Sequence, residues 1–511
     1  MFGKEENKGH ILIRLYDLWK MILKKRRALN LHMMEEASAN QMSIMVTAIC
    51  MLVLVIMLFI PSYLGVGNDE TIVTVMQNAG LRYLEDDLEN GSSYFTRVYE
   101  VEKANENNSF HNYVIRAAKW LDWCFTRDNL FDVRFLALIY TMFYAPAVFL
   151  LVKAALERVT DFTEKLVVSI ATVLIFSDVS YLTYFNSLYV EAILFLGLLY
   201  LFAAAMLLQR KSKYSGIYFG LIVISTLLLC LTKNHCFIIG FVVSGFCYLQ
   251  AHVLEKRIQK IGCYVIAVLL MLCGMLSLKS IDSDYNLTSK FHAMTRGVLL
   301  QSSNPVDTLS SFGIEGSYSM LTDVSLYDQY PITTIDNEVL QDGFLNQFST
   351  VDITFFYIRH PNSLLSMLDL SMKSAYHLRK DYCGNYERTV GMPAYSKSVL
   401  WSTYSTFKVR SAPKTLGFLV LMIVAYSLMA GRQLKLRGNL VRHYYVYLTT
   451  MISITFVGVL HIVSVLIHSG DAQLVEFNFI FGFCLDCLFY FVLTEVLHKL
   501  NIFEHKGEVN G

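Results

Sequence analysis

The feature that most constrains this chain is a series of about ten apolar stretches with few or no charged residues, most of them near the length that spans a bilayer. A helix of about 20 residues, at about 1.5 Å per residue, crosses a hydrocarbon core of about 30 Å. These lengths predict membrane-spanning helices and not barrel strands. The predicted spans are residues 42–63, 135–155, 166–184, 190–208, 216–231, 237–250, 261–278, 416–429, 445–467 and 474–497.

The composition agrees with a membrane protein. The 511 residues are 54% hydrophobic and 17% charged, whereas soluble proteins average about 45–50% and about 25%. The formal net charge is only +1, so no general electrostatic field indicates a nucleic-acid partner. Most of the cysteines lie inside apolar stretches, where cysteine behaves as a small hydrophobe, and a disulfide framework is not expected.

The basic residues indicate which side of the membrane each loop occupies. Lysines and arginines gather in the N-terminal arm, in the tail and in alternate loops, near residues 153–165, 210–213, 256–260 and 432–442. The positive-inside rule makes these loops cytoplasmic. Ten spans then place both termini in the cytoplasm of a multi-pass protein of the cell membrane. The arm, which has apolar residues at helical spacing beside a basic face, is expected to lie on the inner leaflet, and the first span is expected to stay as an anchor.

The predicted fold is an all-α polytopic membrane protein with about ten transmembrane helices, juxtamembrane helices in the first external loop and a small external α-rich domain. The parts are a cytoplasmic amphipathic arm at 1–41, spans one to seven at 42–279 with the first external loop at 65–134, a large extracytoplasmic loop domain at 280–413, spans eight to ten at 414–498, and a cytoplasmic tail at 499–511.

The first candidate site lies directly after the first span, where Asn68, Asp69 and Glu70 begin the first external loop. Helical patterns are expected at 69–88 and 112–125. A carboxylate that is partly desolvated at a membrane surface can act as a general base on a sugar hydroxyl, or hold a divalent cation that neutralises a phosphate leaving group. The ordinary alternative is a helix cap, because Asn and Asp are favoured at the N-cap.

A second polar group lies near the outer ends of the third and fourth spans, where Asp178, Asn186 and Glu191 alternate with tyrosines. An ionisable residue at membrane depth is a functional-site hypothesis by default. Asn186 and Glu191 are candidates for hydrogen bonds to a sugar, with the tyrosines as an apolar face for its ring. The alternative is an interfacial aromatic belt with a polar helix turn.

A very short external turn carries Lys233 and His235 between two spans that are otherwise uncharged. A lysine outside is contrary to the usual bias, so a pairing role is worth considering, and a lipid phosphate is its natural partner. The alternative is a lysine that snorkels to the outer headgroups.

The later external segments supply three more candidates. Arg379 offers bidentate recognition of phosphate, and Asn385 lies in a turn-like cluster at 382–387. Asp471 lies in the last external turn. Most other basic residues of the large loop, Lys380 among them, are expected to be surface charges.

The layout resembles the GT-C superfamily of membrane glycosyltransferases, with one span, an acidic pair, a first external loop with two juxtamembrane helices, many spans and then a large external loop. More narrowly, the motifs at 67–70, 184–191, 302–313 and 382–387 are similar to those of bacterial hexose transferases that build cell-surface glycans. Such relatives often have glycine before the glutamate at 191, whereas this chain has Val190.

The resemblance implies an inverting hexosyltransferase. Its donor would be a polyprenyl-phosphate sugar, and its acceptor a hydroxyl of a glycan or glycolipid outside the cytoplasm. Asp69 maps onto the catalytic first-loop acid and would be the general base, with Glu70 as its neighbour. Lys233 or arginines of the large loop would meet the lipid phosphate. The expected partners are therefore this donor, this acceptor and membrane lipids, with no nucleic acid.

Two alternative functions stay open from the sequence. A multispan polysaccharide polymerase or ligase also has many helices and one large external loop, but it relies on external Arg and His residues. A lipid-linked glycan flippase or transporter would place charges near the middle of spans, where Asp178 and Asp486 are the clear acidic candidates. The chain contains no phosphate-binding glycine loop or dinucleotide fingerprint, so no nucleotide cofactor is expected. A divalent cation stays possible, although two acids are an incomplete coordination set for Mg²⁺ or Ca²⁺.

Overall fold

The structure is a computed structural model, and it describes residues 39–84, 91–103, 109–159, 161–208, 213–232, 236–254, 256–279, 283–326, 333–436, 442–472 and 474–499. Nearly all of the predicted cytoplasmic arm, nearly all of the tail, and the turn with Lys233 and His235 lie outside the described residues.

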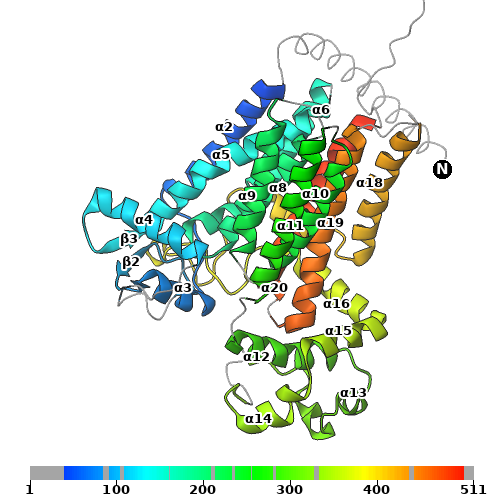
Figure 1. The fold of residues 1–511 in the computed structure, drawn as a ribbon. Coiled ribbons are helices and arrows are strands. Elements are labelled where there is room, and N and C mark those ends of the chain that lie inside the picture. The colour runs from blue at the N-terminus through cyan, green and yellow to red at the C-terminus, as the bar shows by residue number, and fades with distance from the viewer. Residues whose placement is uncertain are drawn as a thin grey trace, which may run out of the picture.

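A bundle of α-helices forms the body of the protein (Figure 1). Among the described residues, five helices are long and apolar enough to cross a membrane, and the number rises to seven if two bent helix pairs each count as one span. Three shorter apolar helices complete the bundle. The chain is therefore a polytopic α-helical membrane protein. The bundle helices are α2 (Ala39–Phe59), α5 (Arg134–Leu156), α6 (Phe162–Phe176), α8 (Glu191–Leu207), α9 (Ser215–Cys230), α10 (Phe237–Ala251), α11 (Arg257–Lys279), α18 (Leu416–Leu436), α19 (Arg442–Ser469) and α20 (Leu474–Lys499).

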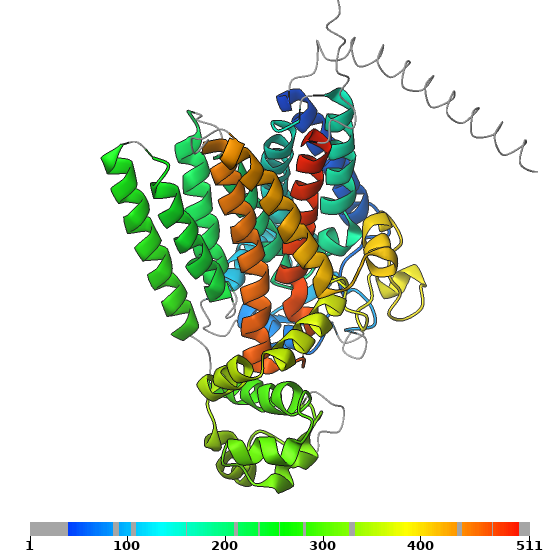
Figure 2. The ribbon, with the colours of Figure 1, turned by 90° about the vertical axis from the view of Figure 1, so that its right-hand side faces the viewer.

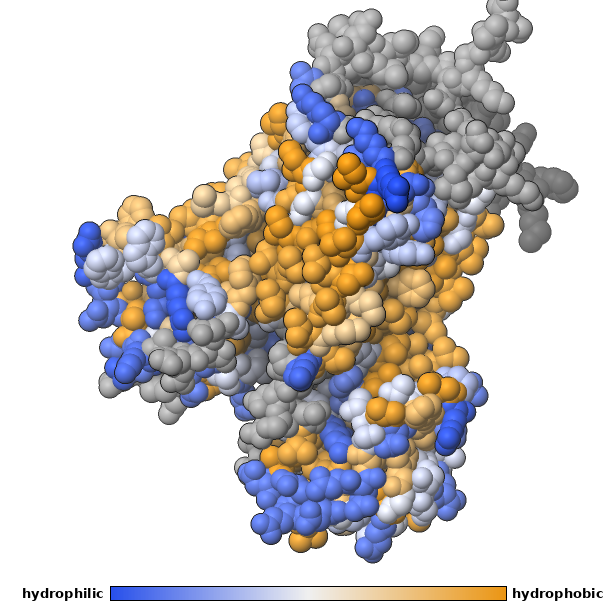
Figure 3. Space-filling model, viewed as in Figure 1, coloured by the Kyte–Doolittle hydropathy of each residue, from blue (hydrophilic) through white to orange (hydrophobic). Residues whose placement is uncertain are grey.

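The helices differ in how much of their surface the protein covers. In the most apolar window of α20, 83% of the residues are buried inside the protein, against 28% in α11. Helix α20 therefore lies in the centre of the bundle, while α11 lies at its edge. On the face shown in Figure 3, the middle of the bundle is apolar, and hydrophilic residues gather at its upper end and on the parts below it. This distribution fits a body surrounded by lipid, since a helix that is apolar all round is buried in protein or in membrane.

The third predicted span is not one straight helix. Helix α6 ends at Phe176, and the chain continues as α7 (Val179–Leu182) and η2 (Thr183–Asn186) after a bend of 42°. Asp178 has an extended backbone and caps α7, because one of its carboxylate oxygens accepts hydrogen bonds from the Ser180 amide at 2.9 Å and the Ser180 hydroxyl at 2.7 Å. The cap replaces the helical hydrogen bonds that are lost at the bend.

The first external loop contains a small sheet that the sequence analysis did not predict. Its elements are α3 (Thr71–Ala79), β1 (Leu81–Arg82), β2 (Val98–Val101), α4 (Phe110–Thr126) and β3 (Leu130–Asp132). The strands form an antiparallel sheet in the order β1-β2-β3. Helix α3 is shorter than the expected 69–88, because the chain turns at Gly80 with φ of 65°. Helix α4 matches the expected 112–125 to within two residues.

The stretch expected as one loop domain at 280–413 divides into two parts. The distal subdomain, residues 283–360, has a hydrophobic core of its own. The returning segment, residues 361–415, packs buried side chains such as Met367 and Met372 into the core of the bundle. Figure 2 shows the yellow part of the returning segment against the side of the bundle, away from the green distal subdomain. The distal elements are α12 (Ser283–His292), η4 (Ala293–Val298), α13 (Pro305–Ser311), η5 (Gly316–Leu321), α14 (Glu338–Gly343), η6 (Leu345–Gln347) and α15 (Thr350–Arg359), and the returning ones are α16 (Pro361–Ser374), η7 (Arg388–Val390) and α17 (Thr403–Ser411).

The distal subdomain meets the bundle at the turn between α19 and α20. The Arg296 guanidinium donates to both carboxylate oxygens of Asp471, at 2.7 and 3.0 Å. Gly470 has φ of +59°, and a Cβ there would lie 2.7 Å from the backbone of Arg296 and Gly297. Glycine at 470 therefore serves both the backbone conformation and the close approach.

We predict that Gly470→Ala lowers the thermal unfolding temperature of the purified protein in detergent. A non-glycine residue in the left-handed region costs about 1–2 kcal/mol, and here a backbone clash adds to that cost. The matched control is Gly313→Ala, because Gly313 has φ of +74° with open space around its Cβ position. Equal losses for the two variants would contradict a close contact at 470.

Candidate active site

The beginning of the first external loop runs beside the returning segment. The Gly67 amide donates to the Gly384 carbonyl at 2.8 Å, and the Gly65 amide donates to the Asn385 carbonyl at 3.1 Å. A Cβ at Gly384 would lie 2.1 Å from the Ser93 carbonyl oxygen, so only glycine fits at this position. Two of the sequence motifs, 67–70 and 382–387, are therefore joined through their backbones.

Asn186 and Asn385 hold this junction together. The Asn186 amide donates to the carbonyls of Leu58 at 3.1 Å and Leu64 at 2.9 Å. The Asn385 amide donates to the Gly65 carbonyl at 2.8 Å. Both side chains are fully buried. Their contacts are with backbone, so their predicted role in substrate binding stays a prediction while their role in shaping the loop is visible.

Asp69 lies at the end of the junction and forms an ion pair with Lys380. The Lys380 ammonium is 2.6 Å from one carboxylate oxygen of Asp69, and the two side chains are 1% and 10% exposed. The other oxygen accepts from the Thr71 hydroxyl at 2.5 Å and the Thr71 amide at 3.1 Å. The N-cap of α3 is Glu70 and not Asn68 or Asp69, but Asp69 still binds the first residue of the helix while it faces a buried cation.

Tyr189 supports this ion pair from the second polar group. Its hydroxyl donates to the Gly67 carbonyl at 3.0 Å and accepts from the Asp69 amide at 2.9 Å. The Lys380 ammonium lies 4.3 Å from the centre of the Tyr189 ring, within the range of a cation–π contact. The motif at 184–191 thus meets the other two at Asp69.

The surroundings keep Asp69 ionised. Burial by itself would raise the pKa of Asp69, but the charge and hydrogen bond of Lys380 and the hydrogen bonds from Thr71 outweigh it, so the pKa lies below its ordinary value of 3.8. A depressed folded-state pKa means that the stabilisation is fully present above pH of about 4 and is lost as the pH falls through the folded-state value.

The other acidic candidates are placed differently. Glu70 is exposed, and Glu191 is 2% exposed at the first turn of α8. Asp178 is buried as the cap of α7, and its second oxygen accepts from the Ser405 amide at 2.9 Å. Asp471 belongs to the contact with the distal subdomain. The structure thus brings Asp69 together with Lys380 and assigns Asp178 and Asp471 contacts that hold elements in place.

Asn68 is buried beside Asp69. Its side-chain amide donates to the Tyr99 hydroxyl at 2.7 Å, and its backbone amide donates to the Gly91 carbonyl at 2.6 Å. These contacts tie the acidic motif to β2 of the small sheet. A substrate contact for Asn68 stays a prediction.

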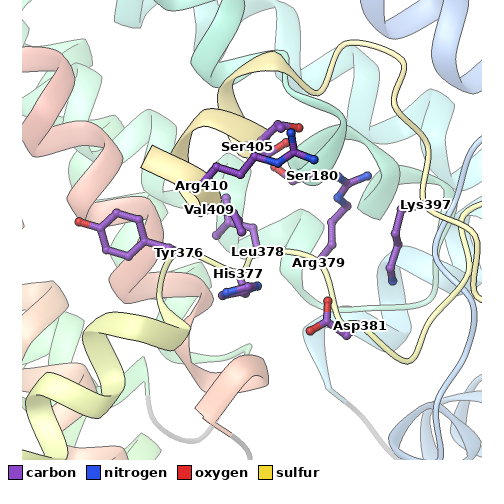
Figure 4. A pocket seen from close by; sticks show the side chains of 11 residues that line it. Ser180, Tyr376, His377, Leu378, Arg379, Asp381, Lys397, Ser405, Val409 and Arg410 are labelled. Carbon is purple, nitrogen blue, oxygen red and sulfur yellow. The ribbon is translucent and has the colours of Figure 1, made fainter. Parts of the chain in front are cut away.

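A cationic cavity of about 260 Å³ opens next to this cluster. Arg379, Lys397 and Arg410 contribute three cations to its wall, and Asp381 contributes one carboxylate. Figure 4 shows these side chains around one space, with Ser180 and Ser405 at its upper edge. One arginine guanidinium can donate two parallel hydrogen bonds to a phosphate group. A cavity with an excess of positive charge therefore suits a phosphate.

Lys397 connects the cavity to the Asp69 cluster. Its ammonium donates to the carbonyls of Lys380 and Cys383. Burial lowers the pKa of Lys397 to about 8, and burial also lowers the pKa of Arg379. At neutral pH both side chains are still mainly cationic.

Several cations of this candidate site were not predicted from the sequence. Lys380 was expected as a surface charge, and neither Lys397 nor Arg410 was proposed for the site. Lys380 lies two residues before the turn-like cluster at 382–387, which was its one available signal. Among the residues that the structure describes, no group of three or more His, Cys, Asp or Glu side chains is arranged to hold a metal ion.

Comparisons with known proteins gave one match. The family model described as the YfdI N-terminal transmembrane domain matches residues 25–511, which include the bundle and both external segments. No curated protein matches the chain, and no solved structure matches it. The description of the family as a transmembrane domain agrees with the apolar helices of the bundle.

We predict that Lys380→Met destabilises the protein by about 3–5 kcal/mol, because it leaves the buried Asp69 carboxylate without its cation. In an Asp69→Asn background the same change should cost much less. Thermal unfolding of the two single variants and the double variant in detergent measures this coupling. Additive losses would contradict a direct ion pair.

Proposed function

The chain belongs to the family of the YfdI N-terminal transmembrane domain, and within this membrane fold we propose that it is a glycosyltransferase of the GT-C type. It would move a hexose from a polyprenyl-phosphate donor to a cell-surface glycan or lipid acceptor outside the cytoplasm, with inversion at the anomeric carbon. The observation that carries the proposal is an ionised, largely buried carboxylate, Asp69, next to a cavity lined by three cations.

Asp69 has room for one more hydrogen bond. An ionised carboxylate offers about four acceptor positions, and donors on Lys380 and Thr71 occupy three of them among the described residues. In the proposed reaction an acceptor hydroxyl takes the fourth position. It gives its proton to Asp69 while its oxygen forms a bond to the anomeric carbon.

The leaving group is the lipid phosphate. The bond between the anomeric carbon and the phosphate oxygen breaks, and the electron pair stays on that oxygen. Arg379, Lys397 and Arg410 would stabilise the added negative charge. Lys380 keeps Asp69 ionised before the reaction.

We also propose that all ten predicted spans cross the membrane. The shorter helices α8, α9 and α10 would then span together with the seven longer units. Figure 1 shows the beginning of α2 at the end of the bundle opposite the first external loop and the distal subdomain. With the positive-inside rule, this arrangement supports the proposal that Asp69 and the cationic cavity face the extracytoplasmic side.

One observation favours a second candidate function. The cationic cavity also contains His377 beside Arg379 and Arg410, and a polysaccharide polymerase or ligase relies on external Arg and His residues. Such an enzyme would use a lipid-linked oligosaccharide in place of a lipid-linked monosaccharide. The flippase alternative has less support, because the carboxylate of Asp486 is paired with Lys408 at 2.6 Å.

We predict that Asp69→Asn lowers transfer about 10²–10⁴-fold, the usual contribution of a general base. The change also leaves the buried Lys380 ammonium without its carboxylate, so transfer is compared only between samples that thermal unfolding shows to be folded. The measurement is transfer of radiolabelled sugar from synthetic polyprenyl-phosphate hexoses to endogenous glycan, with the purified protein in liposomes. Glu70→Gln should cost less because Glu70 is exposed. Glu102→Gln, on the surface of the same loop, is the control. Full activity of Asp69→Asn would remove Asp69 from the mechanism, and no transfer from any such donor would favour the polymerase.

The orientation predicts the labelling of engineered cysteines in intact cells. Asn304→Cys in the distal subdomain should react with a membrane-impermeant thiol reagent from outside, because Asn304 is exposed. Lys211→Cys, in a loop outside the described residues, should react only after the membrane is opened. The half-exposed Cys124 is first replaced by Ser to remove its background. The reverse labelling pattern would place the candidate site in the cytoplasm.

A further inference from the structure

Helix α17 separates two cavities of opposite character. Ser405, Thr406, Val409 and Arg410 lie on one face of the helix and line the cationic cavity. The opposite face lines a second cavity of about 210 Å³ with the side chains Tyr404, Phe407, Lys408 and Ser411. This spacing follows the helical period of 3.6 residues, so each cavity borders its own face of α17.

The second cavity is mainly apolar. Phe418 of α18 and Leu485 and Phe489 of α20 form its far wall. Tyr376 lines both cavities and marks the place where they adjoin. An apolar cavity of roughly 150 Å³ is enough to take up benzene, so the larger volume here is enough for a short branched hydrocarbon.

The charged groups in the wall of the apolar cavity satisfy one another. Lys408 lies 2.6 Å from Asp486, and the two side chains are 4% and 2% exposed. Asp486 also accepts from the hydroxyls of Tyr404 at 2.7 Å and Tyr181 at 2.5 Å. The cavity therefore needs no charged ligand to neutralise it, and the ion pair fixes α17 against α20.

The apolar cavity lies next to an exposed apolar surface. Phe407 lines the cavity and is 55% exposed, and Val420 and Leu421 of the neighbouring α18 are 52% and 62% exposed. Helices α17 and α18 meet at a bend of 112°, which places α17 across the end of a candidate span. With α18 as one of the proposed spans, a hydrocarbon chain of the bilayer would reach the cavity without crossing water.

We propose that the apolar cavity binds the first isoprene units of the lipid whose phosphate occupies the cationic cavity, so that α17 contacts the head of the donor with one face and its tail with the other. The proposal rests on the proposed function for the identity of the lipid. Since hydrocarbon chains are already in apolar surroundings in a bilayer, the cavity gains selectivity through close packing and not through the hydrophobic effect. The five aromatic rings at its wall, on Tyr376, Tyr404, Phe407, Phe418 and Phe489, fit a flat, methyl-branched chain.

The test measures equilibrium binding of three radiolabelled probes to the full-length protein in lipid nanodiscs: undecaprenyl phosphate, phosphatidic acid and inorganic phosphate. Ala412→Phe fills the apolar cavity, which Ala412 lines. It should weaken binding of undecaprenyl phosphate about tenfold or more by steric exclusion and leave inorganic phosphate unaffected. Arg410→Gln should weaken binding of both. Val420→Phe, on the exposed face of α18, is the matched control and should change neither.

Phe418→Trp repeats the test at a half-buried wall position if Ala412→Phe fails to fold. Unchanged affinity for undecaprenyl phosphate in the filled variants would overturn the proposal, as would equal weakening of phosphatidic acid, which would indicate an ordinary phospholipid. Binding that responds as expected, combined with no sugar transfer, would retain the lipid site and reject the glycosyltransferase. Sugar transfer that depends on Asp69 but is unchanged when the apolar cavity is filled would retain the glycosyltransferase and reject the lipid site.

Discussion

The ion pair between Asp69 and Lys380 joins two segments that are 311 residues apart in the sequence. Taking two charges out of water is costly unless geometry and further hydrogen bonds compensate. Thr71 and Tyr189 supply that compensation at the carboxylate, the Asp69 amide and the Lys380 ammonium. The contact depends on the close backbone approach at Gly67 and Gly384, so the loops, the sheet and the returning segment all determine where one carboxylate lies.

The returning segment shows how the bundle holds one short helix between two cavities. Two carboxylates hold helix α17 in place. Asp178 accepts a hydrogen bond from the Ser405 amide, and Asp486 forms an ion pair with Lys408. Both carboxylates lie in the bundle, and both were noticed in the sequence as acids at membrane depth. The structure gives both of them partners on α17. Charges inside the bundle thereby position an element at its edge, where a lipid and a polar acceptor would meet.

The sequence predicted the helices of the bundle well, and it predicted some of the residues that the structure brings together at the candidate site. The fourth predicted span, 190–208, matches α8 to within one residue at each end, because a continuous apolar run has sharp limits. The break at Asp178 was missed because a side-chain cap decides it, and the strands of the first loop are too short to show a period. Asp69 was proposed from its place after the first span. Lys397 and Arg410 were not, since their convergence on one cavity is a property of the tertiary structure.

The separate core of the distal subdomain means that one polypeptide folds in two solvents. Phe291, Phe344 and Tyr357 are buried from water, and the hydrophobic effect drives their association. The bundle helices lie in hydrocarbon, where packing and hydrogen bonds between helices must replace that force. Gly470 and Asp471 lie at the contact between the bundle and the distal subdomain. A change in the composition of the bilayer thus acts directly on the stability of the bundle. It affects the distal subdomain through the contact between the two parts.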